Sequence, residues 1–137
     1  MLPRMTPEEA ALLPIQHLAW MGDAVYDLYC RQKLIISGAT PGQKAHQACS
    51  SLTSAWGQAE ASERLLASLT EKEQELWRRG RNAKGLPRSS PEYCQATGLE
   101  VVMGWLWLSH QHQRLADLFA IILGSEDIEG SSLDINT

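Results

Sequence analysis

The sequence predicts an all-α fold, a single helical bundle of about six or seven helices. Apolar residues recur at intervals of three and four, and Thr–Glu capping pairs occur at two places, whereas the alternating pattern of strands is absent. With 137 residues, of which 44% are hydrophobic, the chain is large enough to bury one core. These observations favour one compact domain over a disordered or multidomain chain.

Two helices are predicted before the first glycine break. Thr6 and Glu9 have the spacing of a capping box, which opens a short helix up to Leu13. Proline is favoured in the first helical turn, so Pro14 can begin a second helix that runs to about residue 36. Gly38 then ends this helix.

The middle of the chain predicts a helical segment rich in Ala, Gln and Ser. Thr40 followed by Pro41 combines an N-cap with a proline at the first helical position. The segment continues to Leu69, with a possible break near residues 50–51.

The remaining elements follow from capping residues and glycines. They are a helix at 70–79 opened by a second capping box, a loop at 80–90, and helices at 91–109 and 113–123. The domain therefore spans residues 1–124, and the polar, acidic residues 125–137 form a flexible tail.

Two acidic residues lie in helices that otherwise suit a protein core. Asp23 interrupts the apolar stripe of residues 18–29 (LAWMGDAVYDLY). Glu100 is the only acidic or basic residue in the segment 93–109, which is apolar on nearly every side. A carboxylate in such surroundings needs a partner, a proton or a cation.

Glycines beside both acids suggest how the acids could meet. Gly22 precedes Asp23, and Gly98 and Gly104 flank Glu100, so two helices could approach closely enough to place both carboxylates on one ion. Oxygen ligands with room for water favour Mg²⁺ or Mn²⁺ over zinc. The alternative is that the acids pair with arginines or cap helix ends.

Basic residues are concentrated in one segment, residues 78–88 (RRGRNAKGLPR), although the net charge is −4. The segment holds five of the twelve Lys and Arg residues, and its Gly, Asn and Pro residues predict an exposed loop. The alternative is that these cations complement the C-terminal end of the preceding helix. It explains Arg78 and Arg79 but not the other three. We therefore predict contact with nucleic-acid phosphates through Arg78, Arg79, Arg81, Asn82, Lys84 and Arg88.

Other features of the sequence limit the class of protein. Cys30, Cys49 and Cys94 are widely spaced, which predicts free buried thiols and neither a disulfide framework nor a zinc site. Asp27, one turn after Asp23, is interpreted as a helper or a solvated residue. A membrane-spanning apolar run and a signal peptide are both missing, so we expect a soluble intracellular protein.

Three ordered motifs resemble a known family. LAWMGDAVYDLY resembles the signature helix of the ribonuclease III catalytic domain, GLEVVMGWLWL resembles its second acidic helix, and RRGRNAK resembles a basic loop. The particular likeness is to Mini-ribonuclease III, a form with the nuclease domain but without the double-stranded RNA-binding domain. The resemblance covers roughly residues 5–123.

The resemblance implies a homodimeric endoribonuclease that cleaves double-stranded RNA. Asp23 and Glu100 match the acids that serve the catalytic Mg²⁺, while Gln16, Ala19 and Thr97 stand where full-length ribonuclease III has further acids. It also implies maturation of the large-subunit (23S) ribosomal RNA precursor, a possible ribosomal-protein helper, and a location in the bacterial cytoplasm or the plastid stroma.

Two other function classes remain open from the sequence. One is a non-cleaving RNA-binding or ribosome-assembly factor on the same fold, which would not need the acid pair. The other is a helical interaction domain, which would need neither the acids nor the basic loop. The apolar helix 93–109, with Trp105 and Trp107 on different faces, further predicts a symmetric subunit contact.

Overall fold

The computed structural model describes residues 3–38, 42–83 and 90–123, and all regular structure within these ranges is helical. The elements are α1 (Pro7–Ala11), α2 (Ile15–Ile36), α3 (Gln43–Thr53), α4 (Ala55–Leu65), the short 3₁₀ helix η1 (Leu66–Ser68), α5 (Glu71–Arg81), α6 (Pro91–Leu108) and α7 (His112–Leu123). The predicted all-α class and number of helices are confirmed. None of the described helices is both long and apolar enough to cross a membrane.

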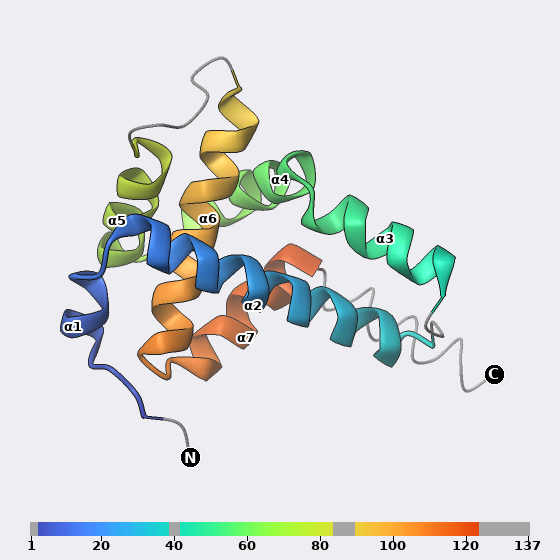
Figure 1. The fold of residues 1–137 in the computed structure, drawn as a ribbon, viewed down its shortest axis with the longest axis horizontal. Coiled ribbons are helices and arrows are strands. Elements are labelled where there is room, and N and C mark those ends of the chain that lie inside the picture. Colours follow the sequence, from blue (N-terminus) through green and yellow to red (C-terminus); the bar gives the residue numbers. More distant parts are fainter. Residues whose placement is uncertain (1–2, 39–41, 84–89, 124–137) are drawn as a thin grey trace.

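Helix α6 forms the centre of the bundle. It runs between α4 and α5, α2 crosses it, and α1 and α7 pack near its C-terminal half (Figure 1). Residues 96–99 and 101–106 are buried within this single chain, and Trp105 Nε1 donates a hydrogen bond to the Pro7 carbonyl at 2.8 Å. The chain's own helices therefore cover most of this helix, whereas Tyr93, Trp107 and Leu108 stay at least partly exposed. The expected subunit contact through part of this helix stays a prediction.

Both predicted capping boxes are present. Thr6 and Glu9 exchange hydrogen bonds of 3.0 and 3.1 Å at the start of α1, and Thr70 and Glu73 exchange bonds of 2.9 and 3.2 Å at the start of α5. Such reciprocal bonds satisfy backbone N–H groups that a helix leaves unpaired at its first turn. The predicted end of α2 is also confirmed, since Gly38 adopts the left-handed φ of 95°.

Other predicted helix ends are displaced by a few residues. The break between α3 and α4 falls at Ser54 and not near 50–51, because the Ser54 hydroxyl accepts a hydrogen bond from the Gly57 N–H at 3.1 Å and so caps α4. Helix α5 continues to Arg81, two residues beyond the predicted end. The predicted start at Thr40 and Pro41 lies outside the described residues.

The crossing of α2 and α6 is a contact of backbone on backbone. A Cβ atom added to Gly22 would lie 1.7 Å from the Glu100 carbonyl oxygen, and one added to Gly104 would lie 2.0 Å from the Leu18 carbonyl oxygen. Gly98 serves a different contact, because its added Cβ would meet Trp77 of α5 at 2.8 Å. Two of the three predicted glycines therefore bring α2 and α6 together, and the third fits α5 against α6.

Candidate active site

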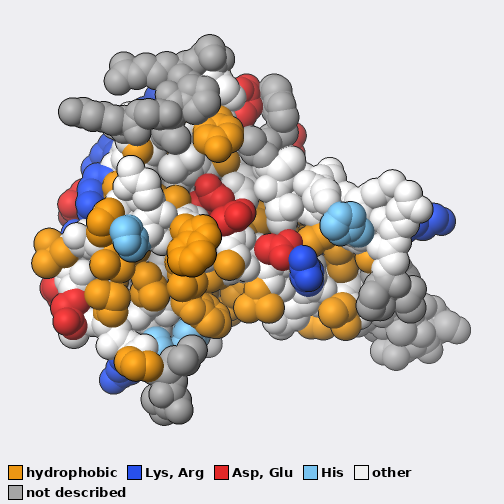
Figure 2. All heavy atoms as spheres, viewed as in Figure 1, with side chains coloured by type: hydrophobic (Ala, Val, Ile, Leu, Met, Phe, Trp, Pro, Cys, Tyr) orange, Lys and Arg blue, Asp and Glu red, His pale blue; other side chains and the backbone are white. Residues whose placement is uncertain are grey.

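The α2–α6 crossing brings the two predicted acids together. Asp23 is exposed on α2, and Glu100 is half-buried on α6, beside the carbonyl that Gly22 touches. The two carboxyl groups lie close enough for the negative charge of Asp23 to act on Glu100. Figure 2 shows acidic side chains gathered at the centre of the face along α2, with hydrophobic side chains beside them.

Burial is the main reason why the pKa of Glu100 is raised from 4.5 to about 8, and the nearby negative charge of Asp23 adds to the effect. At neutral pH the Glu100 carboxyl group therefore keeps its proton when nothing else neutralises it. A divalent cation is the natural replacement for that proton, since it compensates both carboxylates at once.

The donor set fits a hard divalent cation. Both candidate ligands are carboxylate oxygens, and the exposed side of Asp23 leaves space for the waters that Mg²⁺ usually retains. In the described part of the chain, three or more His, Cys, Asp or Glu side chains do not cluster anywhere in a metal-binding arrangement. Asp23 and Glu100 would therefore hold such an ion with two protein side chains and solvent.

Gln58 is a residue of this site that the sequence analysis missed. Helix α4 places the Gln58 side chain, which is only 2% exposed, against the inner side of Glu100, where it acts to lower the pKa of that carboxyl group. A glutamine in a segment rich in Ala, Gln and Ser gives no sequence signal of burial. Its position became evident only from the packing of α4 on α6.

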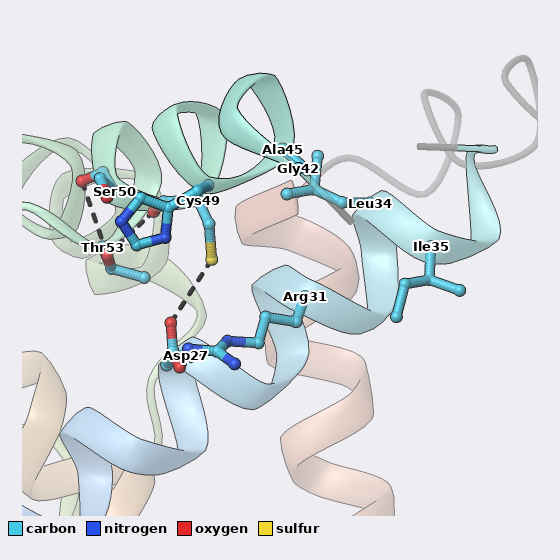
Figure 3. A pocket seen from close by; sticks show the side chains of 10 residues that line it. Asp27, Arg31, Leu34, Ile35, Gly42, Ala45, Cys49, Ser50 and Thr53 are labelled. Carbon is cyan, nitrogen blue, oxygen red and sulfur yellow. Dashed lines mark hydrogen bonds and ion pairs between the residues drawn. The ribbon is translucent and has the colours of Figure 1, made fainter. Parts of the chain in front are cut away.

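Asp27 has partners of its own, away from the acid pair. Its carboxylate forms an ion pair with Arg31 Nε at 2.8 Å and accepts a hydrogen bond from Cys49 Sγ at 3.4 Å. These residues line a groove of about 310 Å³ between α2 and α3, which also includes Ile35 (Figure 3). Asp27 thus joins α2 to α3.

Cys30, Cys49 and Cys94 are not joined to one another by disulfide bonds. Cys30 and Cys49 are buried, and Cys94 is half-buried. Burial raises the pKa of Cys30 to about 12, so this thiol stays protonated and unreactive at neutral pH.

The described part of the basic segment lies at the end of α5. Arg78 is exposed, Arg79 Nη1 donates to the Ala11 carbonyl at 2.9 Å, and the Arg81 guanidinium lies 5.6 Å from the centroid of the Trp77 ring. Asn82 caps the helix. Arg79 therefore connects α5 to α1. The other two predicted RNA contacts, Lys84 and Arg88, lie outside the described residues.

The end of α5 packs beside the turn of α6 that carries Glu100. A Cβ added to Gly80 would lie 2.8 Å from Val101 Cγ2 and 2.9 Å from Gly98 Cα, on either side of Glu100 in the sequence. Arg81 follows Gly80 directly. The basic end of α5 thus packs against the turn of α6 that carries Glu100.

Comparison with known proteins places this geometry in a family. The Ribonuclease III domain matches residues 16–111, a range that contains both acids and the basic end of α5. A Mini-ribonuclease 3 of Symbiobacterium thermophilum is 38% identical over 110 residues, which cover 77% of this chain and 85% of that protein. A Mini-ribonuclease 3 of a Synechococcus species is 42% identical over 111 residues, covering 77% of this chain and 78% of that protein.

A solved structure agrees with the fold. The X-ray crystal structure of a protein from Fusobacterium nucleatum has a TM-score of 0.70 at 24% identity and covers 80% of this chain and 90% of its own. At that identity the likeness supports the helical arrangement alone. Together with the family match and the two relatives, it shows that the chain belongs to the ribonuclease III domain family, among proteins similar to Mini-ribonuclease 3.

Proposed function

We propose that the protein is a Mg²⁺-dependent endoribonuclease that cleaves double-stranded RNA. The observation that supports this function best is the meeting of Asp23 and Glu100 at a backbone crossing, within a ribonuclease III domain. A binding module would not need two carboxyl groups held together at such a cost in desolvation.

The chain's own residues divide the work of the proposed site. Asp23 offers its carboxylate on the solvent side, and Glu100 offers one from within the helix packing. When bound, Mg²⁺ supplies a water of lowered pKa and positive charge at the scissile phosphate. Thr97 stands at one of the positions without an acid, and its Oγ1 donates a hydrogen bond to the Tyr93 carbonyl of its own helix at 3.0 Å.

Incubation with defined RNAs tests the proposed activity. The purified chain is expected to cleave an RNA duplex of about 30 base pairs (nearly three turns of A-form helix) with Mg²⁺ and not with EDTA, and to leave each single strand intact. Binding of the duplex without cleavage at any Mg²⁺ concentration would instead favour the RNA-binding or ribosome-assembly factor. Absence of both binding and cleavage would leave only the helical interaction domain.

The natural substrate is proposed from the resemblance to the Mini-ribonuclease proteins. We infer that it is the precursor of the large-subunit (23S) ribosomal RNA in a bacterial cytoplasm, with a ribosomal protein as a possible helper. A-form RNA hides its base edges in a narrow major groove, so recognition would depend on duplex shape, 2′-hydroxyls and phosphates.

The basic segment is expected to supply phosphate contacts. Changing Arg81, Lys84 and Arg88 together to alanine should weaken duplex binding for all sequences, because each lost phosphate contact reduces the number of counterions released. The slope of log K against log salt should flatten by about 0.9 per contact. Binding measured between about 50 and 200 mM salt checks this, since several phosphate contacts change affinity by orders of magnitude over that range. An unchanged slope would place the RNA surface elsewhere.

The homodimer is proposed on a different surface from the one expected. On α2, Trp20, Leu28 and Ile35 are 79%, 49% and 63% exposed and lie on one face of the helix, beside Asp23. A second copy covering this face would bring two acid pairs near each other, as cleavage of both strands requires. Figure 2 shows the hydrophobic side chains on this side of the molecule.

Replacing Leu28 with aspartate is expected to convert a dimer into a monomer, because a charge buried at a symmetric contact is repeated in both copies. Sedimentation at micromolar concentration measures the change. Ile121→Asp is the matched control, since Ile121 is an exposed apolar residue (41%) on α7. Equal effects of the two variants, or a wild-type monomer, would contradict this assignment of the dimer face.

A further inference from the structure

Two polar residues face inward from α4, and only one of them has its hydrogen bonds satisfied. Gln58 and Ser62 lie one turn apart and are 2% and 1% exposed. Ser62 Oγ accepts a hydrogen bond from Trp77 Nε1 at 2.6 Å. Gln58 Nε2 is buried and makes no hydrogen bond of good geometry among the described residues, although the amide lies near enough to Glu100 to lower the pKa of that carboxyl group. Burying an N–H group in this way is unfavourable. Stability alone therefore does not account for a glutamine at this position.

The backbone holds Gln58 firmly in place. The Gln58 N–H donates to the Ser54 carbonyl at 2.9 Å in the first turn of α4. The preceding residue, Gly57, lies so close to the end of α3 that an added Cβ would be 2.5 Å from the Leu52 carbonyl oxygen. The backbone position of Gln58 is therefore fixed, and its side-chain amide lies close to the carboxyl group of Glu100.

The unsatisfied N–H group lies behind the acid that would bind the cation. An ionised Glu100 has acceptor capacity on both oxygens, so it can take a hydrogen bond from the inner side and a cation from the outer side. Gln58 is too deeply buried to reach RNA itself.

We propose that Gln58 is a positioning residue for the acid pair: its amide donates to the inner oxygen of Glu100 and leaves the outer oxygen, with Asp23, for the divalent ion. This inference rests on the proposed function, because it assumes that the pair binds Mg²⁺. Hydrogen bonds to metal-ligating carboxylates orient them, and their loss typically reduces metal affinity or activity by about 10- to 100-fold.

The test is a Mg²⁺ titration of Gln58→Met, which keeps the length of the side chain but removes its amide. Thermal unfolding at increasing Mg²⁺ gives the dissociation constant of the ion independently of cleavage, because stabilisation grows as RT ln(1 + [Mg²⁺]/Kd). The dissociation constant and the Mg²⁺ concentration needed for half-maximal cleavage, together called the Mg²⁺ midpoints, should both rise about 10-fold or more. Unfolding in EDTA should be unchanged or occur at a higher temperature. A purely structural role would lower stability in EDTA and leave the Mg²⁺ midpoints alone.

Ser62→Ala is the matched control on the same face of α4. It removes the acceptor of Trp77 and should lower stability in EDTA, but it should not move either Mg²⁺ midpoint. If Gln58→Met keeps the wild-type midpoints, Gln58 does not position the acid pair. If Gln58→Met and Gln58→Leu both fail to fold, Gln58 is structural and the inference is overturned.

The failure of this inference can be told apart from that of the proposed function. A wild-type chain that Mg²⁺ neither stabilises nor activates would overturn both. A wild-type chain that responds to Mg²⁺, beside a Gln58→Met variant with the same response, would overturn the role of Gln58 alone.

Discussion

Replacing Gly22 with alanine is expected to destabilise the protein by about 3 kcal/mol or more, enough to unfold much of it. The new Cβ would lie 1.7 Å from the Glu100 carbonyl oxygen, and neither atom belongs to a flexible side chain. Helices α2 and α6 would have to separate, which exposes core around Leu18 and loosens the acid pair. Urea unfolding measures the loss as a fall in the midpoint.

Ala24→Gly is the control for this prediction. It removes a Cβ at an exposed position of the same helix and should cost only about 1 kcal/mol, the usual helix-propensity difference between alanine and glycine. A Gly22→Ala variant as stable as the Ala24→Gly variant would mean that the two helices do not touch through their backbones at this point.

Those glycines also show how far the sequence could predict the site. A glycine next to an acid in each of two apolar helices indicated a close approach, and the structure has that approach at Gly22 and Gly104. The sequence could not assign each glycine to its partner helix. Gly98 was grouped with the acid crossing, although it packs against Trp77, because one glycine looks like another until the helices are placed.

Features that depend on residues close together in the chain could be predicted from the sequence, and features that depend on packing could not. The capping boxes at Thr6 and Thr70 form because each involves residues only three apart in the chain. Gln58 was missed because its burial depends on how α4 meets α6. The apolar character of helix 93–109 likewise could not show which surface a second copy would contact, because the number of helices that cover it depends on the fold.

The largest expected effect on activity belongs to the acid pair. Asp23→Asn and Glu100→Gln should each reduce Mg²⁺-dependent cleavage of duplex RNA by about a thousandfold or more, because several kcal/mol of charge stabilisation depend on the cation and each 1.36 kcal/mol is tenfold in rate. Both substitutions nearly preserve shape but remove a ligand charge. Single-turnover cleavage of one defined duplex, at saturating enzyme, measures the loss.

Stability gives an independent check that loss of cleavage is not loss of fold. Folded Glu100 keeps its proton up to a pKa of about 8, whereas an unfolded glutamate releases it near 4.5. The wild-type protein without metal should therefore lose stability as the pH rises through that window, since the unfolded state binds fewer protons there than the folded state. Below that window both states hold the proton, and the penalty is absent.

Glu100→Gln lacks this penalty, so in EDTA its stability relative to the wild type should grow between pH 5 and pH 8, on the order of 1–3 kcal/mol. Mg²⁺ should stabilise the wild type and not the variant, because only the wild type has both carboxylates. If Glu100→Gln is more stable than the wild type, does not respond to Mg²⁺ and does not cleave RNA, Glu100 is required for Mg²⁺ binding and for catalysis. Full cleavage by either variant would separate the acid pair from catalysis, whatever the stability measurements showed.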